Sequence, residues 1–268
     1  MIIDGRAISR ELLARIREEN TGGVTVRAIT VAPTPATRSY LRIKERAAQE
    51  AGMQLDVVQL PDSATTEEVV GAVEAPGAGA VIVQLPLPPH IHEARVLAAI
   101  PVEKDADVLS PAARSRALVP PVAAAVEEIL ARATISPKGK RVVVIGKGKL
   151  VGEPVAVRLA QQGAHVSSYD ERDFTPSVLS DADIVVSGTG VPHLVKPEML
   201  TEGVALIDAG TSEQKPAGNE GGTVLVGDID PACAALASVY TPVPGGVGPI
   251  TVACLFRNVA ELARLQKS

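Results

Sequence analysis

The stretch RVVVIGKGKLVGEP, residues 141–154, decides the fold. It opens with an apolar, β-branched run typical of a buried strand, and residues 151–162 have the pattern of a helix. Between them the glycines form a GxGxxxG variant of the phosphate-binding turn. Glycine lets the backbone approach a pyrophosphate, and a helix N-terminus offers free amides and a favourable dipole. The sequence therefore predicts a dinucleotide site that includes Gly146, Lys147, Gly148 and Gly152.

Strand-like and helix-like segments alternate on both sides of this stretch. Such alternation predicts an α/β fold with parallel sheets and right-handed crossovers. We expect strands at 24–31, 55–60, 80–85, 141–146, 165–168, 183–187, 204–207 and 223–226. We expect helices at 6–19, 36–51, 90–100, 122–132, 151–162 and 250–265, and another that starts at a capping box formed by Thr65 and Glu68.

The length of 268 residues is enough for two ordinary domains, and a short polar stretch between Pro111 and Pro121 marks a boundary. The prediction is an N-terminal α/β substrate domain, residues 1–118, followed by a Rossmann-type dinucleotide-binding domain, residues 119–248. The C-terminal helix, within 249–268, is expected to pack back on the first domain.

Charge and composition exclude several classes of protein. A net charge of −5 leaves no basic excess for a general nucleic-acid binder. No apolar run is long enough to span a membrane, and the N-terminus lacks the apolar stretch of a signal peptide, so we expect a cytoplasmic protein. Cys233 and Cys254 are expected to be buried free thiols. His90 and His92 have no accompanying carboxylate or cysteine cluster, so no metal site is predicted.

Acidic residues bear on the choice of cofactor. Asp170 and Glu171 follow the second strand of the dinucleotide half, where an acidic side chain accepts hydrogen bonds from the adenosine ribose and repels a 2′-phosphate. This favours NAD over NADP. The alternatives are that the loop is simply solvated, or that Lys147 and Lys149 attract a phosphate. Asp228 and Asp230, in the segment GDID, are compatible with ligand contacts and equally with turn and capping roles.

Four side chains of the first half suggest proton-transfer chemistry. Tyr40 and Lys44 stand four apart on a predicted helix and share one face. Gln84 ends the strand at 80–85, at the sheet edge where ligands gather, and Asp107 follows in EKDAD. A partly desolvated lysine beside a carboxamide has a lowered pKa and exchanges protons near neutrality. Each residue alone is ordinary, and an isolated surface lysine or tyrosine is usually structural or solvated.

The segments around these residues carry a family resemblance. The chain resembles the bifunctional methylenetetrahydrofolate dehydrogenase/methenyltetrahydrofolate cyclohydrolase family over nearly its whole length, with the matching segments in the same order. These segments are SYLRIK (39–44), VQLPLPPHI (83–91), EKDAD (103–107), VVVIG and VGEP (within 142–154), and TPVPGGVGPIT (241–251).

The resemblance implies a homodimeric enzyme of one-carbon metabolism and purine biosynthesis, with a tetrahydrofolate substrate and NAD or NADP. It implies that Lys44 is the catalytic lysine and that Gln84 holds its proton state. Tyr40 would pack on the folate ring system, and Asp107 would anchor the polar edge of the pterin. The substrate's aminobenzoyl portion would lie against Pro244, Gly245 and Gly248.

Departures from the family pattern leave two rival hypotheses. The family usually reads KDVDG where this chain has Val108 in place of the glycine, and Pro-Cys-Thr-Pro where it has residues 120–123, PPVA. Its cofactor turn usually carries Arg-Ser in place of Lys147-Gly148, and NADP-using members often have His-Ser in place of Asp170-Glu171. The rivals are a monofunctional NAD-dependent dehydrogenase and a non-catalytic folate- or nucleotide-binding paralogue.

Overall fold

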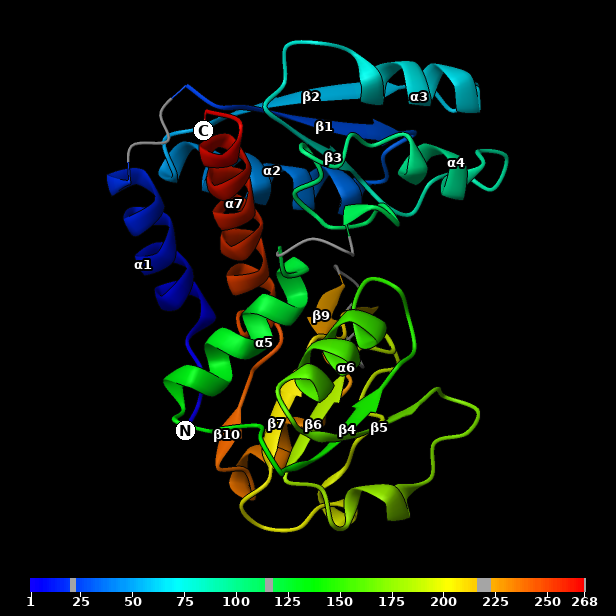
Figure 1. The fold of residues 1–268 in the computed structure, drawn as a ribbon. Coiled ribbons are helices and arrows are strands. Elements are labelled where there is room, and N and C mark those ends of the chain that lie inside the picture. The colour runs from blue at the N-terminus through cyan, green and yellow to red at the C-terminus, as the bar shows by residue number, and fades with distance from the viewer. Residues whose placement is uncertain (20–22, 114–117, 216–222, 268) are drawn as a thin grey trace. The chain divides into compact units, whose positions relative to one another are not determined.

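Two compact units make up the chain, in a computed structural model that describes residues 1–19, 23–113, 118–215 and 223–267 (Figure 1). The five-stranded unit comprises Met1–Ile8 and Val122–Thr251. The three-stranded unit comprises Ser9–Pro121 and Val252–Ser268. Helices α1 (Gly5–Glu18) and α7 (Val247–Leu265) contribute residues to both units.

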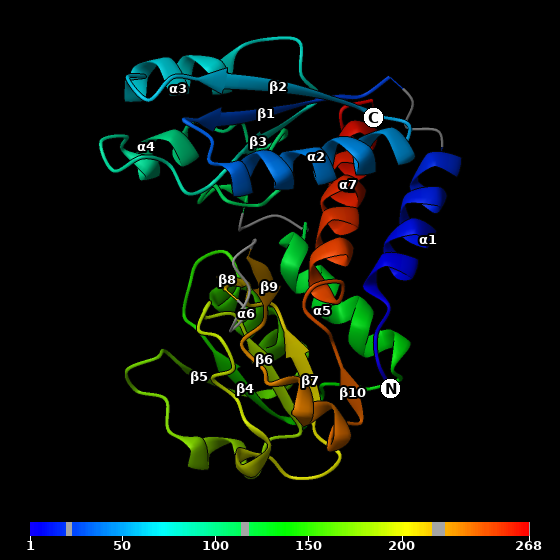
Figure 2. The same ribbon diagram turned by 180° about the vertical axis from the view of Figure 1, so that it is seen from behind.

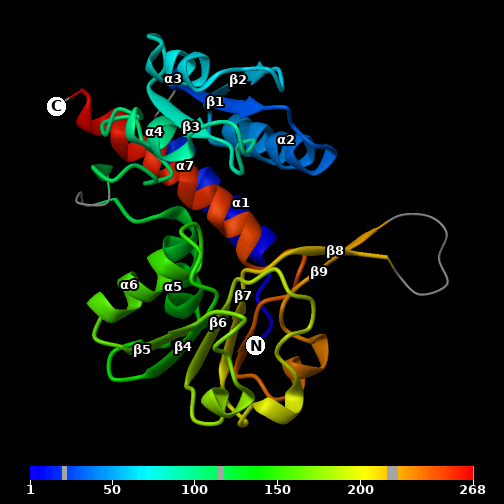
Figure 3. The same ribbon diagram turned by 90° about the vertical axis from the view of Figure 1, so that its right-hand side faces the viewer.

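The five-stranded unit is a parallel sheet with the strand order β10-β7-β6-β4-β5. Its strands are β4 (Arg141–Ile145), β5 (His165–Tyr169), β6 (Ile184–Ser187), β7 (Ala205–Asp208) and β10 (Val239–Tyr240). Helices α5 (Pro121–Arg132) and α6 (Gly152–Gln161) cover one face (Figure 3). The chain leaves β4 for β5 on one side and then returns to β6 on the other. This reversal opens a crevice at the carboxyl end of β4, the usual ligand site of such sheets.

Apolar side chains explain why these segments form central strands. All four residues of β6 and of β7 are buried, as are the last four of β4. Strands that are buried on both faces are continuous apolar runs, as predicted for a parallel sheet covered by helices. Three short 3₁₀ helices also belong to this unit: η2 (Pro176–Leu179), η3 (Pro197–Met199) and η4 (Pro231–Ala235).

The strand predicted at 223–226 forms, but outside the main sheet. Strand β9 (Val224–Val226) pairs antiparallel with β8 (Ser212–Gln214) in a separate two-stranded ribbon (Figure 3). The fifth strand of the sheet is instead β10, which the sequence analysis missed because two residues show no periodicity. The N-terminal residues extend that edge: the Ile3 amide donates to the Tyr240 carbonyl and the Tyr240 amide donates to the Met1 carbonyl, both at 2.9 Å.

The three-stranded unit is also a parallel sheet, with the order β2-β1-β3. Its elements are β1 (Thr25–Val31), α2 (Pro35–Glu50), β2 (Gln54–Leu60), α3 (Thr66–Glu74), β3 (Ala80–Val83) and α4 (Glu93–Ala98). Helix α4 is shorter than the predicted 90–100 because the imidazole of His92 caps it, with Nδ1 accepting from the Arg95 amide at 3.2 Å.

The C-terminal helix packs on the first domain, as predicted. The Asn258 amide donates to the carbonyls of Ala106 and Val119, both at 2.9 Å. Beyond the helix, Gln266 donates to the carbonyls of Gly79 and Glu103. Figure 2 shows α7 running alongside α1.

Both cysteines are thiols in the protein interior. Cys233 and Cys254 are buried, and neither forms a disulfide bond. His90 bonds to the Ala64 carbonyl, and the described residues contain no group of three or more His, Cys, Asp or Glu side chains that could hold a metal ion. None of the helices within the described ranges has the length and apolarity needed to cross a bilayer.

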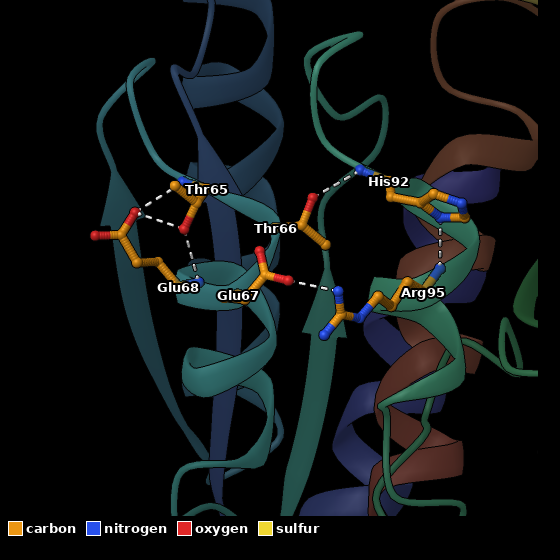
Figure 4. Close-up of polar contacts among 6 residues, drawn as sticks. All are labelled: Thr65, Thr66, Glu67, Glu68, His92 and Arg95. Atoms are coloured by element: carbon orange, nitrogen blue, oxygen red, sulfur yellow. Dashed lines mark hydrogen bonds and ion pairs between the residues drawn. The ribbon is translucent and has the colours of Figure 1, made fainter.

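The predicted capping box is present at the start of α3 (Figure 4). The Thr65 hydroxyl accepts from the Glu68 amide at 3.2 Å, and the Glu68 carboxylate accepts from the Thr65 amide at 2.7 Å. Thr66 accepts from the His92 amide, and Glu67 pairs with Arg95. These contacts join the first turn of α3 to α4.

Thr65→Ala should lower the free energy of unfolding by about 1 kcal/mol, because the Glu68 amide at the helix start loses its hydroxyl acceptor. Urea denaturation measures the change. Glu67→Gln, which weakens only the exposed pair with Arg95, is the matched control and should cost about 0–1 kcal/mol at most. Equal losses in the two variants would contradict the role assigned to the capping box.

Candidate active site

The first candidate cluster surrounds a buried lysine on α2. Every third or fourth residue of this helix faces the sheet, so Leu41, Lys44, Ala47 and Ala48 are its buried residues. Only 5% of Lys44 is exposed. Its ammonium group lies 5.1 Å from the ring centroid of Tyr40, one turn earlier on the same face. The spacing of four residues therefore places the two side chains together, as expected.

Gln84 fixes the lysine from the neighbouring sheet. It follows the last residue of β3, and its backbone amide donates to the Ile29 carbonyl of β1 at 2.8 Å. Its side-chain Oε1 accepts from Lys44 Nζ at 3.1 Å, and its Nε2 donates to the Leu85 carbonyl at 3.0 Å. Flipping the amide would lose both bonds, so its orientation is set.

Electrostatics in this cluster favour neutral groups. Burial lowers the pKa of Lys44, and the Asp107 carboxylate opposes that shift. Burial raises the pKa of Asp107. The charge of Lys44 opposes this rise, and the charge of Asp105 adds to it. Burial and then Asp107 raise the pKa of Tyr40 to about 12, so its hydroxyl stays protonated at neutral pH. Lys44 can therefore reach its neutral amine form, the form that accepts a proton, more readily than a solvated lysine.

The turn that carries Asp107 survives the loss of the family's glycine. Val108 adopts φ +57°, in the left-handed region that costs a side-chain-bearing residue roughly 1–2 kcal/mol. Asp105 closes the turn, because its carboxylate accepts from the amides of Leu109 at 3.2 Å and Ser110 at 2.7 Å. The backbone conformation is thus held from Asp105 rather than by the residue at position 108.

The second cluster is the glycine turn after β4. Gly146 has φ +104°, and a Cβ there would lie 2.7 Å from the Gly188 carbonyl oxygen. A Cβ on Gly152 would lie 1.6 Å from the Gly146 oxygen, so α6 can start here only with glycine. Gly148 faces open space instead. Two of the three predicted glycines are therefore required by packing within the turn, and the third leaves room above it.

A surface pocket beside this turn is lined by Asp170, Glu171, Arg172 and Thr189. Asp170 Oδ1 accepts from the amides of Arg172 and Asp173, so the acidic run is an ordered turn. Lys147 bonds to Asp173 and lies 3.9 Å from Asp170 Oδ2. Arg172 and Thr189 line the pocket but are not among the residues predicted from the sequence. The available signal for Thr189 was its place just after a fully buried strand.

The Pro-Gly-Gly loop belongs to the five-stranded unit. Gly245 has φ +110°, and its carbonyl accepts from the Gly5 amide at 2.9 Å. Pro244 precedes it in the same loop. Gly248 was predicted in the loop but lies in the first turn of α7, which begins at Val247. The helix starts earlier than predicted because Pro249 is tolerated in a first turn, where its missing amide is not needed.

Two buried aspartates stand at the carboxyl edge of the same sheet. Asp208 ends β7 and is 1% exposed; Asp228 follows β9 and is 0% exposed. Asp208 accepts from the amides of Gly210, Asp228 and Ile229. Burial raises the pKa of Asp208 to about 7. The Asp228 carboxylate adds to this rise, whereas the three amide hydrogen bonds oppose it. Asp208 was not singled out from the sequence. Asp230, by contrast, caps η4 by accepting from the Ala232 amide.

Comparison with known proteins agrees with this architecture. Residues 3–107 match the model of the tetrahydrofolate dehydrogenase/cyclohydrolase catalytic domain, and residues 120–267 match that of its NAD(P)-binding domain. The bifunctional protein FolD 2 of Arabidopsis thaliana is 34% identical, over 98% of this chain and 95% of its own. The bifunctional protein FolD of Moorella thermoacetica is 35% identical, over 98% of each chain.

A solved structure is similar over the whole chain. The Trypanosoma brucei methylenetetrahydrofolate dehydrogenase-cyclohydrolase, in complex with NADP and an inhibitor, superposes with a TM-score of 0.93. The two proteins are 34% identical, and the match covers 100% of this chain and 98% of the other.

The raised pKa of Asp208 predicts a pH-dependent stability. The folded protein holds this proton up to about pH 7, whereas the unfolded chain releases it near 3.8. The contribution of the protonated Asp208 to the free energy of unfolding is therefore present below the pKa of the unfolded chain and is lost as the pH rises towards 7. Relative to wild type, Asp208→Asn should gain up to about 4 kcal/mol of unfolding free energy between pH 4 and pH 7.

Denaturant titrations at several pH values measure this difference. Asp183→Asn is the control with the opposite sign. Hydrogen bonds from the Arg141 amide and Lys140 lower the pKa of Asp183, so its contribution is present above the unfolded pKa and is lost as the pH falls. A wild-type-to-Asp208→Asn difference that stays flat across this range would refute the assignment.

Proposed function

The chain belongs to the tetrahydrofolate dehydrogenase/cyclohydrolase family, and on that premise we propose which of its side chains carry each half of the reaction. It is a bifunctional methylenetetrahydrofolate dehydrogenase and methenyltetrahydrofolate cyclohydrolase. The first half-reaction removes a hydride from methylenetetrahydrofolate and gives methenyltetrahydrofolate. The second adds water and gives formyltetrahydrofolate.

Lys44 serves the hydrolytic half as the general base. The observation that supports this role is the hydrogen bond from its buried Nζ to Gln84 Oε1 at 3.1 Å. Its lowered pKa makes the neutral amine available, so that Nζ can accept a proton from water as the water oxygen bonds to the methenyl carbon. Gln84 holds one N–H of that amine, which fixes the direction of the nitrogen lone pair.

Two other side chains orient the folate. Tyr40 lies beside Lys44 and offers an aromatic face for the ring system together with a protonated hydroxyl. Asp107, whose raised pKa keeps a proton available, suits the polar edge of the pterin, which has both donors and acceptors. Pro244, Gly245 and Gly248 are proposed to contact the aminobenzoyl portion. Burial of Lys44 against Gln84 favours this bifunctional assignment over a monofunctional dehydrogenase or a non-catalytic paralogue.

The five-stranded unit fits a dinucleotide. Gly146 and Gly152 are required by packing within the turn, and Gly148 faces open space, so a phosphate has room to approach the turn at the start of α6. We assign the phosphates to Gly146, Lys147, Gly148 and Gly152, and the adenosine ribose to Asp170 and Glu171 in the surface pocket. When bound, the nicotinamide supplies the hydride acceptor.

The pocket favours NAD. Asp170 Oδ2 is not used by the acidic turn, so it can accept from ribose hydroxyls and would repel a 2′-phosphate. The nearby cation is already compensated, because Lys147 interacts with both Asp173 and Asp170. Arg172 on the same rim is the residue that could favour NADP, the cofactor bound by the Trypanosoma brucei relative. We weigh the two acidic side chains above this single arginine.

Further assignments depend on the family. We propose a homodimer in the cytoplasm that serves purine biosynthesis, with small molecules rather than nucleic acid or membrane as partners. As functional units we propose residues 1–118 with 249–268 for folate chemistry and 119–248 for cofactor binding.

Lys44→Met should lower the rate of methenyltetrahydrofolate hydrolysis by about a hundredfold or more, because the general base is lost. The dehydrogenase rate should fall much less, since Lys44 only orients folate in that step. Loss of methenyltetrahydrofolate absorbance follows hydrolysis, and cofactor reduction follows oxidation.

Lys138→Met, on the surface of the other unit, is the matched control and should change neither rate. Gln84→Glu adds a test that does not remove the lysine: a carboxylate beside Nζ should raise the pKa of Lys44 and move the rising limb of the pH–rate profile to higher pH. An unchanged hydrolysis rate in Lys44→Met would remove Lys44 from this role.

The cofactor proposal predicts a higher kcat/KM with NAD than with NADP. Asp170→Ser should raise the kcat/KM ratio of NADP to NAD by about tenfold, because a repelling charge disappears while the serine hydroxyl can still accept from the turn amides. Asp181→Ser removes an exposed aspartate that does not line the pocket and should leave the ratio unchanged. A wild-type enzyme that prefers NADP would overturn the NAD assignment.

A further inference from the structure

Asp228 has no assigned role in either half-reaction, yet it is one of the most constrained side chains in the five-stranded unit. Its Oδ2 accepts from the Ser187 hydroxyl at 2.8 Å, the Thr189 amide at 2.6 Å and the Thr189 hydroxyl at 2.9 Å. The Ser187 hydroxyl belongs to the last residue of β6, and the two Thr189 donors lie in the loop that follows, about forty positions before Asp228 in the sequence. One carboxylate oxygen therefore holds both ends of a three-residue turn.

That loop lies against the proposed cofactor site. The Gly188 amide donates to the Ile145 carbonyl at 2.9 Å, and the Gly188 oxygen occupies the space that a Cβ on Gly146 would need. Thr189 lines the pocket together with Asp170. A shift of the loop would thus move a wall of the pocket and the support of the glycine turn together.

The position of Asp228 is itself fixed by Asp208. The Asp228 amide donates to Asp208 Oδ1 at 3.2 Å, and the Ile229 amide donates to Oδ2 at 2.8 Å. Glycines make room for both carboxylates: a Cβ on Gly210 would lie 2.0 Å from Asp228 Oδ1, and one on Gly227 would lie 2.1 Å from Asp208 Oδ2. The two aspartates form a rigid support for the loop after β6.

The second oxygen of Asp228 is left unsatisfied in this arrangement. Oδ1 is buried and has no hydrogen-bond partner among the described residues. An unsatisfied buried oxygen costs free energy, and an alanine at this position would avoid that cost. What the carboxylate provides in return is the set of three bonds from Oδ2 to the loop.

We propose that Asp228 is a positioning residue for the dehydrogenase half-reaction, whose carboxylate holds Ser187 and Thr189 so that the loop after β6 forms the wall of the dinucleotide pocket. The inference depends on the cofactor site proposed above. The role proposed for Asp228 affects the two activities differently, because hydrolysis needs water and Lys44 but no dinucleotide. A residue that acts only on the cofactor wall therefore affects oxidation and spares hydrolysis.

The test uses the full-length enzyme and measures both activities. Asp228→Ala should raise the KM for NAD, and its dissociation constant by calorimetry, about tenfold or more, because the loop loses its anchor. The hydrolysis rate should stay within about twofold of wild type. Asp228→Asn keeps one acceptor oxygen, and its KM for NAD should lie between those of wild type and Asp228→Ala. Asp230→Asn, a neighbouring cap outside the network, should leave dinucleotide binding unchanged.

A purely structural role predicts a different result, namely that both activities fall in proportion to the folded fraction while the KM for NAD stays constant; that result would overturn the proposal. Thr189→Val removes one donor without removing bulk and keeps the test available if Asp228→Ala does not fold. If Asp170→Ser alters cofactor choice while Asp228→Ala leaves dinucleotide binding unchanged, this inference alone fails. If neither variant affects the cofactor, the proposed cofactor site fails as well.

Discussion

Polar and titratable groups that are removed from water need polar partners, and this constraint organises the functional part of both units. Lys44 is buried where Gln84 can accept from it, and Asp208 is buried where three backbone amides converge. Gln84 and Gly210 each follow a strand of a parallel sheet, whereas the amides of Asp228 and Ile229 come from the loop after β9 of the antiparallel ribbon. Each unit thus has one place where backbone groups and loop side chains satisfy a buried titratable group.

Much of the fold could be predicted because it follows from periodicity. The apolar run before Gly146, the alternation of strands with helices, and the threonine–glutamate spacing at Thr65 are all local signals. Strands β8 and β10 were not predicted, and β9 was predicted without its antiparallel partner, because strands of two or three residues carry too little pattern. Gly248 was misplaced for a related reason, since a proline-containing first turn reads as loop.

The residues of the candidate site fall into the same two groups, those that local sequence signals predict and those that only the fold brings together. Tyr40 and Lys44 could be paired from their spacing, and Gln84 from its place at a strand end. The network of Ser187, Thr189 and Asp228 could not, because it joins loops about forty residues apart through side chains that each suit an ordinary turn. Topology brings them together: β6 and β7 are neighbours in the sheet, and Asp208 at the end of β7 binds the amide of Asp228.

The turn at Val108 has an implication for how this family diversifies. The left-handed backbone is enforced by Asp105, through the amides of Leu109 and Ser110, so the conformation no longer depends on the residue that adopts it. Asp105 also stands in the family pattern KDVDG, so this restraint is retained here while position 108 carries a buried valine. A change at position 108 therefore leaves the turn that presents Asp107 in place, and by itself it carries little information about whether the activity has been lost.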